Sequence, residues 1–275
     1  MDYFKLTNPL PSVYRFEDPR GVFATLLVGE KQALLVDTGM GIGNISAAVC
    51  RITALPLIVA NTHGHIDHMG GNYQFDHVYL HEADYPVVQN WIGQAHKQRI
   101  LEIAPTLIPE DFDAEKFYEY HGENLEALNV HMTFDLGGLR VDVVPMQTHT
   151  QGSVGYLCRE RELLLTGDCI SDVVYLVFAG GGTVSKHIAM LEAVQELPFS
   201  VMLSSHCEAL MEKGRLESFL HCAKNVDPAQ TVLFRNPLFP EYREHMFVDN
   251  NPGSSEEYAA LVYSEDKLDT EGKEC

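Results

Sequence analysis

Residues 61–72 read Asn61-Thr62-His63-Gly64-His65-Ile66-Asp67-His68-Met69-Gly70-Gly71-Asn72. Three histidines and an aspartate fall within six residues, directly after an apolar run at 55–60 that is typical of a buried strand. In an extended chain His63 and His65 point to the same side, because side chains alternate with a period of two. Three imidazoles and a carboxylate packed so closely need a compensating positive charge. The stretch therefore predicts a metal site.

Four ligands do not complete two tetrahedral metal sites, so further donors should follow later strands. His149, Asp168 and His206 each come directly after, or shortly after, an apolar run, at 140–146, 162–165 and 201–205. Functional side chains of α/β proteins gather at the ends of strands. The candidate metal ligands are therefore His63, His65, Asp67, His68, His149, Asp168 and His206.

The pattern around these residues predicts an α/β fold. Runs at 22–28 and 32–36 predict a hairpin, Asn44 is expected to begin a helix, and 78–80 reads as a short strand. Further expected elements are strands at 140–146, 154–158, 162–165 and 201–205, a helix capped by Ser185, a helix around 210–225 and one candidate strand at 259–263.

Residues 84–128 differ from this alternation and predict a helical insertion. Asp84 followed by Tyr85 and Pro86 is a typical helix start, and 112–128 is also helical in composition. We expect residues 1–249 to form one domain, with 84–128 as its lid or an interface, and 250–275 to form an acidic tail. Side chains of the insertion that could line a substrate pocket are Tyr85, Trp91, Phe117 and Tyr118, and His96 and His121 could also contact substrate.

The composition limits the partners. The 275 residues carry a net charge of −20, which repels nucleic acid and anionic lipid, so a small-molecule substrate is expected. No run of 18 apolar residues and no signal peptide are seen, which predicts no membrane span. The six cysteines form no CxxC pair, which favours reduced thiols in a cytoplasmic protein. The oligomeric state stays open.

With these motifs in hand, the chain resembles the metallo-β-lactamase superfamily over about residues 20–210. The pattern T-H-x-H-x-D-H-x-G-G is complete from Thr62 to Gly71, and Asp37-Thr38-Gly39 follows an earlier strand. The resemblance implies a four-layer αββα sandwich with two metal ions at one edge. It assigns His63, His65 and His149 to the first ion and Asp67, His68 and His206 to the second, with Asp168 bridging both.

The resemblance also narrows the branch of the family. An aspartate at Asp168 is expected in hydroxyacylglutathione hydrolases, lactonases, RNase Z-like nucleases and flavodiiron proteins, and not generally in true β-lactamases. Flavodiiron proteins usually have a glutamate where His65 stands and carry an added flavodoxin domain. RNase Z-like enzymes need a basic arm that a chain of charge −20 does not suggest. The chain therefore looks closest to the hydroxyacylglutathione hydrolase and lactonase branch.

The expected activity is hydrolysis of an ester, thioester or lactone by a hydroxide that bridges two metal ions. Zinc is the expected metal, and the donor types also fit iron or manganese. Asp67 and Asp168 are the candidate catalytic carboxylates. Asp37 is expected to orient a ligand imidazole, and Tyr175 and Ser171 could donate to a developing oxyanion. Alternatives are a small-molecule phosphodiesterase, a di-iron redox protein and a metal-binding protein without activity.

Overall fold

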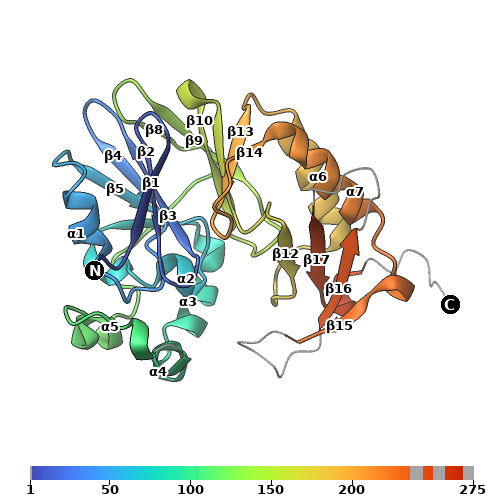
Figure 1. The fold of residues 1–275 in the computed structure, drawn as a ribbon, viewed down its shortest axis with the longest axis horizontal. Coiled ribbons are helices and arrows are strands. Elements are labelled where there is room, and N and C mark those ends of the chain that lie inside the picture. The colour runs from blue at the N-terminus through green and yellow to red at the C-terminus, as the bar shows by residue number, and fades with distance from the viewer. Residues whose placement is uncertain (1, 104, 236–243, 250–257, 269–275) are drawn as a thin grey trace.

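Two β-sheets face each other, and helices cover their outer faces (Figure 1). The computed structural model describes residues 2–103, 105–235, 244–249 and 258–268. This arrangement confirms the expected four-layer αββα sandwich. A third, smaller sheet, which the sequence did not predict, lies beside the second sheet.

The first sheet has seven strands in sequential order. Strands β3 and β4 form the predicted hairpin, and β4 then pairs in parallel with β5, the strand that leads into His63. The strands are β1 (Lys5–Leu10), β2 (Val13–Glu17), β3 (Phe23–Val28), β4 (Ala33–Val36), β5 (Leu57–Ala60), β6 (Val78–Leu80) and β7 (Leu125–Ala127).

The second sheet has six strands in the order β14-β13-β11-β10-β9-β8. Its antiparallel pairs β9–β10 and β10–β11 continue into the parallel pair β11–β13, so the ends of β11 and β13 lie at the same edge. The strands are β8 (Thr133–Asp135), β9 (Arg140–Pro145), β10 (Val154–Cys158), β11 (Leu163–Gly167), β13 (Val201–Ser204) and β14 (Met211–Glu212).

Helices form the outer layers and the insertion. Asn44 caps the first helix as expected, through its side-chain oxygen and the amide of Ala47, whereas Thr183 and not Ser185 caps α6. The α-helices are α1 (Ile45–Cys50), α2 (Ile66–Met69), α3 (Tyr85–Trp91), α4 (Gln94–Ile103), α5 (Ala114–Glu119), α6 (Val184–Gln195) and α7 (Leu216–Lys224).

Apolar side chains fill each space between the layers. The layer between the two sheets contains Leu34 and Val36 of the first sheet and Val143 and Tyr156 of the second. A separate cluster packs α1 against the outside of the first sheet, and another packs α6 and α7 against the second and third sheets. Burial of apolar surface at about 25 cal/mol per Å² makes these layers the main source of stability. They hold the strand ends that carry the candidate site.

The third sheet has the order β12-β17-β16-β15. Strand β17, the candidate strand at 259–263, is confirmed and is buried between β12 and β16. The remainder of the predicted tail falls largely outside the described residues, and the division at residue 250 stays a prediction. The strands are β12 (Val173–Leu176), β15 (Val232–Phe234), β16 (Glu244–Asp249) and β17 (Ala259–Tyr263).

The insertion is helical only in part. Helices α3, α4 and α5 lie together below the first sheet (Figure 1). The expected helix at 112–128 is wrong beyond Glu119, because Gly122 takes a φ of 83° and β7 then pairs in parallel with β6. A left-handed residue ends a helix, and pairing with a distant strand is not visible in local sequence. The insertion therefore returns to the sheet at its edge.

Candidate metal centre

The seven candidate ligands converge at one edge of the sandwich. They come from the segment between β5 and α2, from α2 itself and from the loops after β9, β11 and β13. Three overlapping groups of donors result: His63 with His65 and His149, His63 with His68 and Asp168, and Asp67 with His68 and His206. We call His63, His65 and His149 the first trio, and Asp67, His68 and His206 the second trio.

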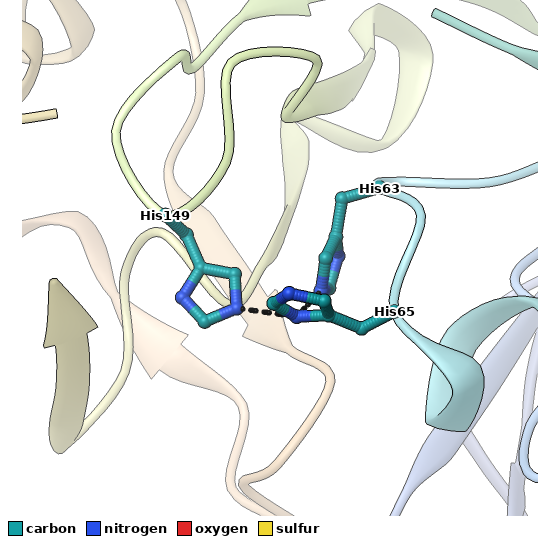
Figure 2. Close-up of side chains that lie close together, drawn as sticks. All are labelled: His63, His65 and His149. Carbon is teal, nitrogen blue, oxygen red and sulfur yellow. Dashed lines mark hydrogen bonds between the residues drawn. The ribbon is translucent and has the colours of Figure 1, made fainter. Parts of the chain in front are cut away.

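The first trio consists of three buried imidazoles whose nitrogens face one point. The Nε2 atom of His63 lies 2.9 Å from Nδ1 of His65, and Nε2 of His149 lies 3.0 Å from the same atom (Figure 2). All three side chains are at most 5% exposed. The trio can offer three neutral nitrogen donors to one ion.

The second trio mixes a buried imidazole with more exposed groups. The Oδ2 atom of Asp67 lies 3.5 Å from Nε2 of His68 and 3.4 Å from Nε2 of His206. The His68 side chain is fully buried, whereas the side chains of Asp67 and His206 are 28% and 36% exposed. This trio therefore faces solvent on one side.

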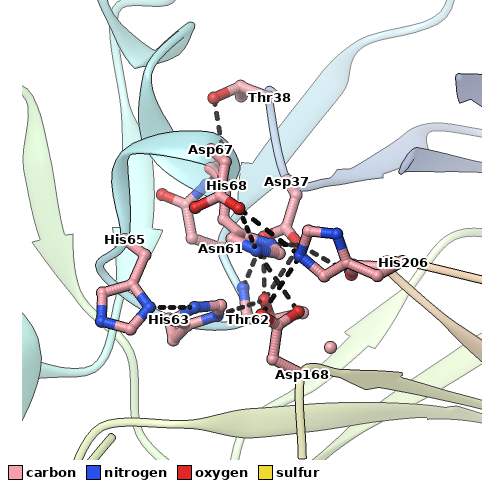
Figure 3. A network of polar contacts seen from close by, with 12 residues as sticks. Asp37, Thr38, Asn61, Thr62, His63, His65, Asp67, His68, Asp168 and His206 are labelled. Carbon is pink, nitrogen blue, oxygen red and sulfur yellow. Dashed lines mark hydrogen bonds and ion pairs between the residues drawn. The ribbon is translucent and has the colours of Figure 1, made fainter. Parts of the chain in front are cut away.

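Asp168 lies between the two trios. Its Oδ2 atom is 3.2 Å from Nε2 of His206, and its Oδ1 atom is 3.3 Å from Nε2 of His68 (Figure 3). Its Oδ2 atom is also 3.5 Å from Nε2 of His149. One carboxylate thus contacts donors of both trios. A bridging ligand requires such a position.

Two buried polar atoms without a hydrogen-bond partner indicate whether the residues fit a metal ion. Among the described residues, Nε2 of His68 and Oδ1 of Asp168 are buried side-chain atoms without a hydrogen-bond partner. An unpaired buried polar atom is costly, and each of these two faces the other donors. Ligands at 2.0–2.1 Å from a tetrahedral zinc ion lie roughly 3.3 Å apart, close to the separations of 3.2–3.5 Å in and around the second trio. The donor set fits divalent metal ions.

Asp37 orients the imidazole of His68. Its Oδ2 accepts a hydrogen bond of 2.9 Å from Nδ1 of His68, and its Oδ1 accepts one of 2.7 Å from the amide of Thr62. Because a carboxylate only accepts, Nδ1 of His68 carries the hydrogen, and Nε2 is the nitrogen that can offer a lone pair to an ion. Asp37 has a φ of 64°, a strained conformation for a residue with a side chain. The expected contact with a ligand imidazole is present.

Two similar contacts orient the first trio. The backbone carbonyl of Tyr175, on β12, accepts a hydrogen bond of 2.8 Å from Nδ1 of His149. Nδ1 of His63 lies 3.0 Å from the hydroxyl of Thr62, which is itself 2.9 Å from Asp37. In both histidines Nε2 therefore remains the lone-pair nitrogen that faces the site.

The pKa shifts divide the histidines in the same way. Burial lowers the pKa of His63 and His65 well below the ordinary histidine value, and it also lowers the pKa of His149. For His206 burial opposes protonation, but the carboxylates of Asp168 and Asp67 outweigh it and raise its pKa to about 10. The first trio thus favours neutral donors, and the second trio attracts positive charge even without an ion.

A cavity of about 540 Å³ opens beside the centre and is lined by Asp67, Asp168 and His206. Trp91 and Phe178 form an aromatic wall next to the first trio, with ring centroids 5.6 Å and 4.2 Å from that of His65. The expected pocket residues Trp91, Tyr175, Ser171 and His96 line the cavity.

Four other residues that were expected to line the pocket or contact substrate are corrected. Phe117 is 1% exposed and packs in the core of the insertion, in ring contact with Tyr73 and Phe112. Tyr85 and Tyr118 are not among the described residues that line the cavity, nor is His121. Tyr85 lies at the other end of α3 from Trp91, and Phe117 and Tyr118 lie on α5.

Sequence reasoning missed three residues that touch the centre or its loops. Phe178 stands against His65 and His149, with ring centroids 4.2 and 5.0 Å away. Arg15 is buried and donates hydrogen bonds to the carbonyls of Ser204, Cys207 and Glu208, which surround His206. Asp84 was read as a helix cap, but its side chain makes no cap hydrogen bond to α3. Their contacts are all with distant segments, so no local pattern indicated them.

Comparison with known proteins identifies the family. A profile described as the Metallo-beta-lactamase superfamily matches residues 18–206. Curated relatives include Acyl-coenzyme A thioesterase MBLAC2 from Homo sapiens, 24% identical over 204 residues, covering 62% of this chain and 66% of that protein. Hydroxyacylglutathione hydrolase GloC from Haemophilus influenzae is 25% identical over 150 residues, covering 51% and 62%. The chain thus spans somewhat less than two thirds of the length of these relatives.

Solved structures support the same fold. A superfamily protein from Sulfolobus tokodaii matches with a TM-score of 0.55 at 16% identity, covering 88% of this chain and 93% of that one. A metallo-beta-lactamase from Pontibacter korlensis matches with a TM-score of 0.58 at 17% identity, covering 81% and 100%. The chain belongs to the metallo-beta-lactamase superfamily. No helix in the described part of the chain is long and apolar enough to cross a membrane.

Proposed function

We propose that the protein hydrolyses an ester, thioester or lactone bond of a small molecule at a centre of two divalent metal ions. The observation that carries this proposal is the position of Asp168, within 3.5 Å of ring nitrogens from both trios. His63, His65 and His149 would hold one ion, and Asp67, His68 and His206 the other. Zinc suits these donors best, and iron or manganese remain outcomes of metal analysis.

Divalent ions at such a centre supply a water nucleophile near neutral pH and polarise the oxygen of the bond under attack. The remaining steps fall to side chains that face the cavity. Asp67 is 28% exposed and lies beside His206, so it can orient the attacking water or pass a proton to the leaving group. Burial raises the pKa of Tyr175, which keeps its hydroxyl protonated as a donor. Tyr175 and Ser171 can then stabilise the developing oxyanion.

The cavity favours a substrate with an apolar part beside the reacting bond. Trp91 and Phe178 stand next to the first trio, and Met40, Ile66 and Ile100 also line the space. Removal of apolar surface from water at about 25 cal/mol per Å² makes such a wall a strong determinant of binding. Relatives named as a thioesterase and a hydroxyacylglutathione hydrolase are consistent with a thioester.

One observation favours a second candidate, a phosphodiesterase of small molecules. Arg20 and Arg99 line the same cavity, and a guanidinium is the usual partner of a phosphate. An anionic group on a thioester substrate would use the same arginines. The arginines therefore favour an anionic substrate for either reaction.

A substrate panel separates these activities. The metal-loaded protein is assayed with acyl thioesters of increasing chain length, with lactones and with a nitrophenyl phosphodiester. The proposal expects hydrolysis of an ester, thioester or lactone that disappears after chelation and in the Asp168→Ala variant. Turnover of the phosphodiester alone would contradict the proposed bond type and support the second candidate.

A further inference from the structure

A buried carboxylate outside the two trios joins the loops that carry the first trio. Asp84 lies at the start of α3 and is 0% exposed. Its Oδ2 accepts hydrogen bonds from the amide of Gly64, at 2.8 Å, and from the hydroxyl of Thr150, at 2.7 Å. Its Oδ1 accepts one from the amide of Gly152, at 2.7 Å. Three donors converge on one carboxylate.

These donors belong to the backbone around the first trio. Gly64 stands between His63 and His65, and Thr150 directly follows His149. The two segments are far apart in sequence and approach each other only where the two sheets meet. A single carboxylate therefore spans both sides of the first trio, and the distances between the trio's nitrogens depend on both segments keeping their positions.

Close packing reinforces this link. A Cβ atom at position 152 would lie 2.6 Å from Cγ of Asp84, and one at position 64 would lie 3.0 Å from its backbone oxygen. Only glycine leaves room for these approaches, and the hydrogen bonds to both amides require them. The glycines at 64 and 152 are thus explained by the same carboxylate.

The link also includes the insertion. Although Asp84 occupies the position before α3, its side chain turns away from the helix toward the two loops. The opposite end of α3 carries Trp91, whose ring lies 5.6 Å from that of His65. Asp84 therefore fixes where α3 starts relative to the first trio, and α3 places the aromatic wall.

We propose that Asp84 is a positioning residue that holds the two loops of the first trio in register with each other and with α3. This inference rests on the proposed metal centre. The second trio has other supports, because Asp37 orients His68 and Arg15 binds the carbonyls around His206. Loss of the Asp84 carboxylate should therefore weaken the first metal site and leave the second nearly unchanged. Substitution of groups that orient metal ligands typically costs 10–100-fold in metal affinity.

Stepwise metal titration of the full-length apoprotein tests this role without any substrate. Zn²⁺ binding is followed by calorimetry and Co²⁺ binding by absorption for the wild type and for Asp84→Asn. The His65→Ala variant, which lacks one donor of the first trio, identifies the equivalent that belongs to it. In Asp84→Asn the affinity of this equivalent should fall about 10–100-fold, while the other changes by less than about twofold.

A matched control lies in the same insertion. Asp113 caps α5 by accepting from the amide of Lys116 and is exposed, so Asp113→Asn should leave both affinities unchanged. Unchanged affinities in folded Asp84→Asn would overturn the proposal. An equal loss at both sites would also overturn it, since that is the result of general destabilisation.

A second variant keeps the test decisive if Asp84→Asn does not fold. Thr150→Val preserves side-chain shape and removes the hydroxyl that bonds to Asp84 and also contacts the hydroxyl of Ser153. It should weaken the same equivalent by a smaller factor, and wild-type affinity would overturn the proposal. The titration measures metal binding alone, so its result stands even if the proposed substrate class is wrong. A wild-type protein that binds no metal would overturn the proposed function and this inference together.

Discussion

The two trios differ in how far their side chains are exposed to solvent. The first is made of three imidazoles that are each at most 5% exposed, and an aromatic wall stands against it. The second contains a carboxylate and an imidazole that are 28% and 36% exposed. The first trio is therefore the more enclosed of the two, although His65 and His149 line the cavity together with Asp67 and His206.

The supports of the two trios differ as well. The first trio is held by the backbone carbonyl of Tyr175 and by Asp84, both outside the local motif. The second is held by Asp37 and by Arg15. Asp37 contacts both trios, because it binds His68 directly and reaches His63 through Thr62. Substitutions at Asp84 and at Arg15, which each support one trio, should separate the two sites.

The largest effect is expected where the trios meet. Asp168→Ala removes the carboxylate that contacts both, so at least one metal equivalent should be lost. Activity should fall by more than about 100-fold, beyond the range of substitutions that only orient ligands. Metal analysis and kcat/KM measure both effects. Two retained equivalents with full activity would remove Asp168 from the bridge.

Asp37→Asn should act on the second trio. The side-chain amide of asparagine can donate a hydrogen bond to Nδ1 of His68, whereas the carboxylate can only accept one. The tautomer with its hydrogen on Nδ1 and its lone pair on Nε2 is then no longer favoured. We expect a loss of about 10–100-fold in the affinity of the second equivalent, with a smaller change at the first. Titration of the apoprotein provides the measurement, and a selective loss at the first equivalent would reverse the assignment of Asp37.

Arg15→Met should loosen the loop that carries His206. The substitution leaves the carbonyls of Ser204, Cys207 and Glu208 without their charged donor, and the methionine retains apolar contact with Phe23. A hydrogen bond to a charged group contributes about 1.5–3 kcal/mol, so the free energy of unfolding should fall by at least about 2 kcal/mol. Denaturant unfolding measures this loss. Wild-type stability would show that the loop keeps its conformation without Arg15.

The smallest effect on the metal centre is expected at the side chain of Tyr175. Tyr175→Phe removes the hydroxyl that faces the cavity and keeps the backbone carbonyl that holds His149. Metal content should therefore not change, whereas kcat should fall by up to about 100-fold if the hydroxyl donates to the oxyanion. An unchanged kcat across the whole substrate panel would leave Tyr175 with only its backbone role.

The candidate ligands could be found in the sequence because they stand in local patterns, and the sandwich followed from the family resemblance that the same motif carries. The short motif at 61–72 and the strand ends before Asp168 and His206 carry their chemistry in the residue types themselves. The roles of Asp84 and Arg15 depend on contacts with loops 66 and 189–193 residues away, which no window of sequence contains. Their identification required the folded chain.

The same limit explains the errors in the fold. The sequence does not predict strands β1, β2, β8, β12, β14, β15 and β16, because each is short or lies at or near a sheet edge, where the neighbouring strand determines the structure. Residues 112–128 have a helical composition, but the last part of this segment forms β7 because it pairs with β6. The third sheet places β12 beside β17, and the carbonyl of Tyr175 on β12 then reaches His149. A segment read as a tail therefore lies one strand away from the first trio.

Metal analysis of the purified, untagged protein tests the central claim most directly. The arrangement of two trios around Asp168 predicts about two divalent ions per chain, most simply zinc. Retention of one ion in His65→Ala would show that the two trios bind separately. A protein that holds no ion, or only one at saturating metal with all seven ligands intact, would contradict the account.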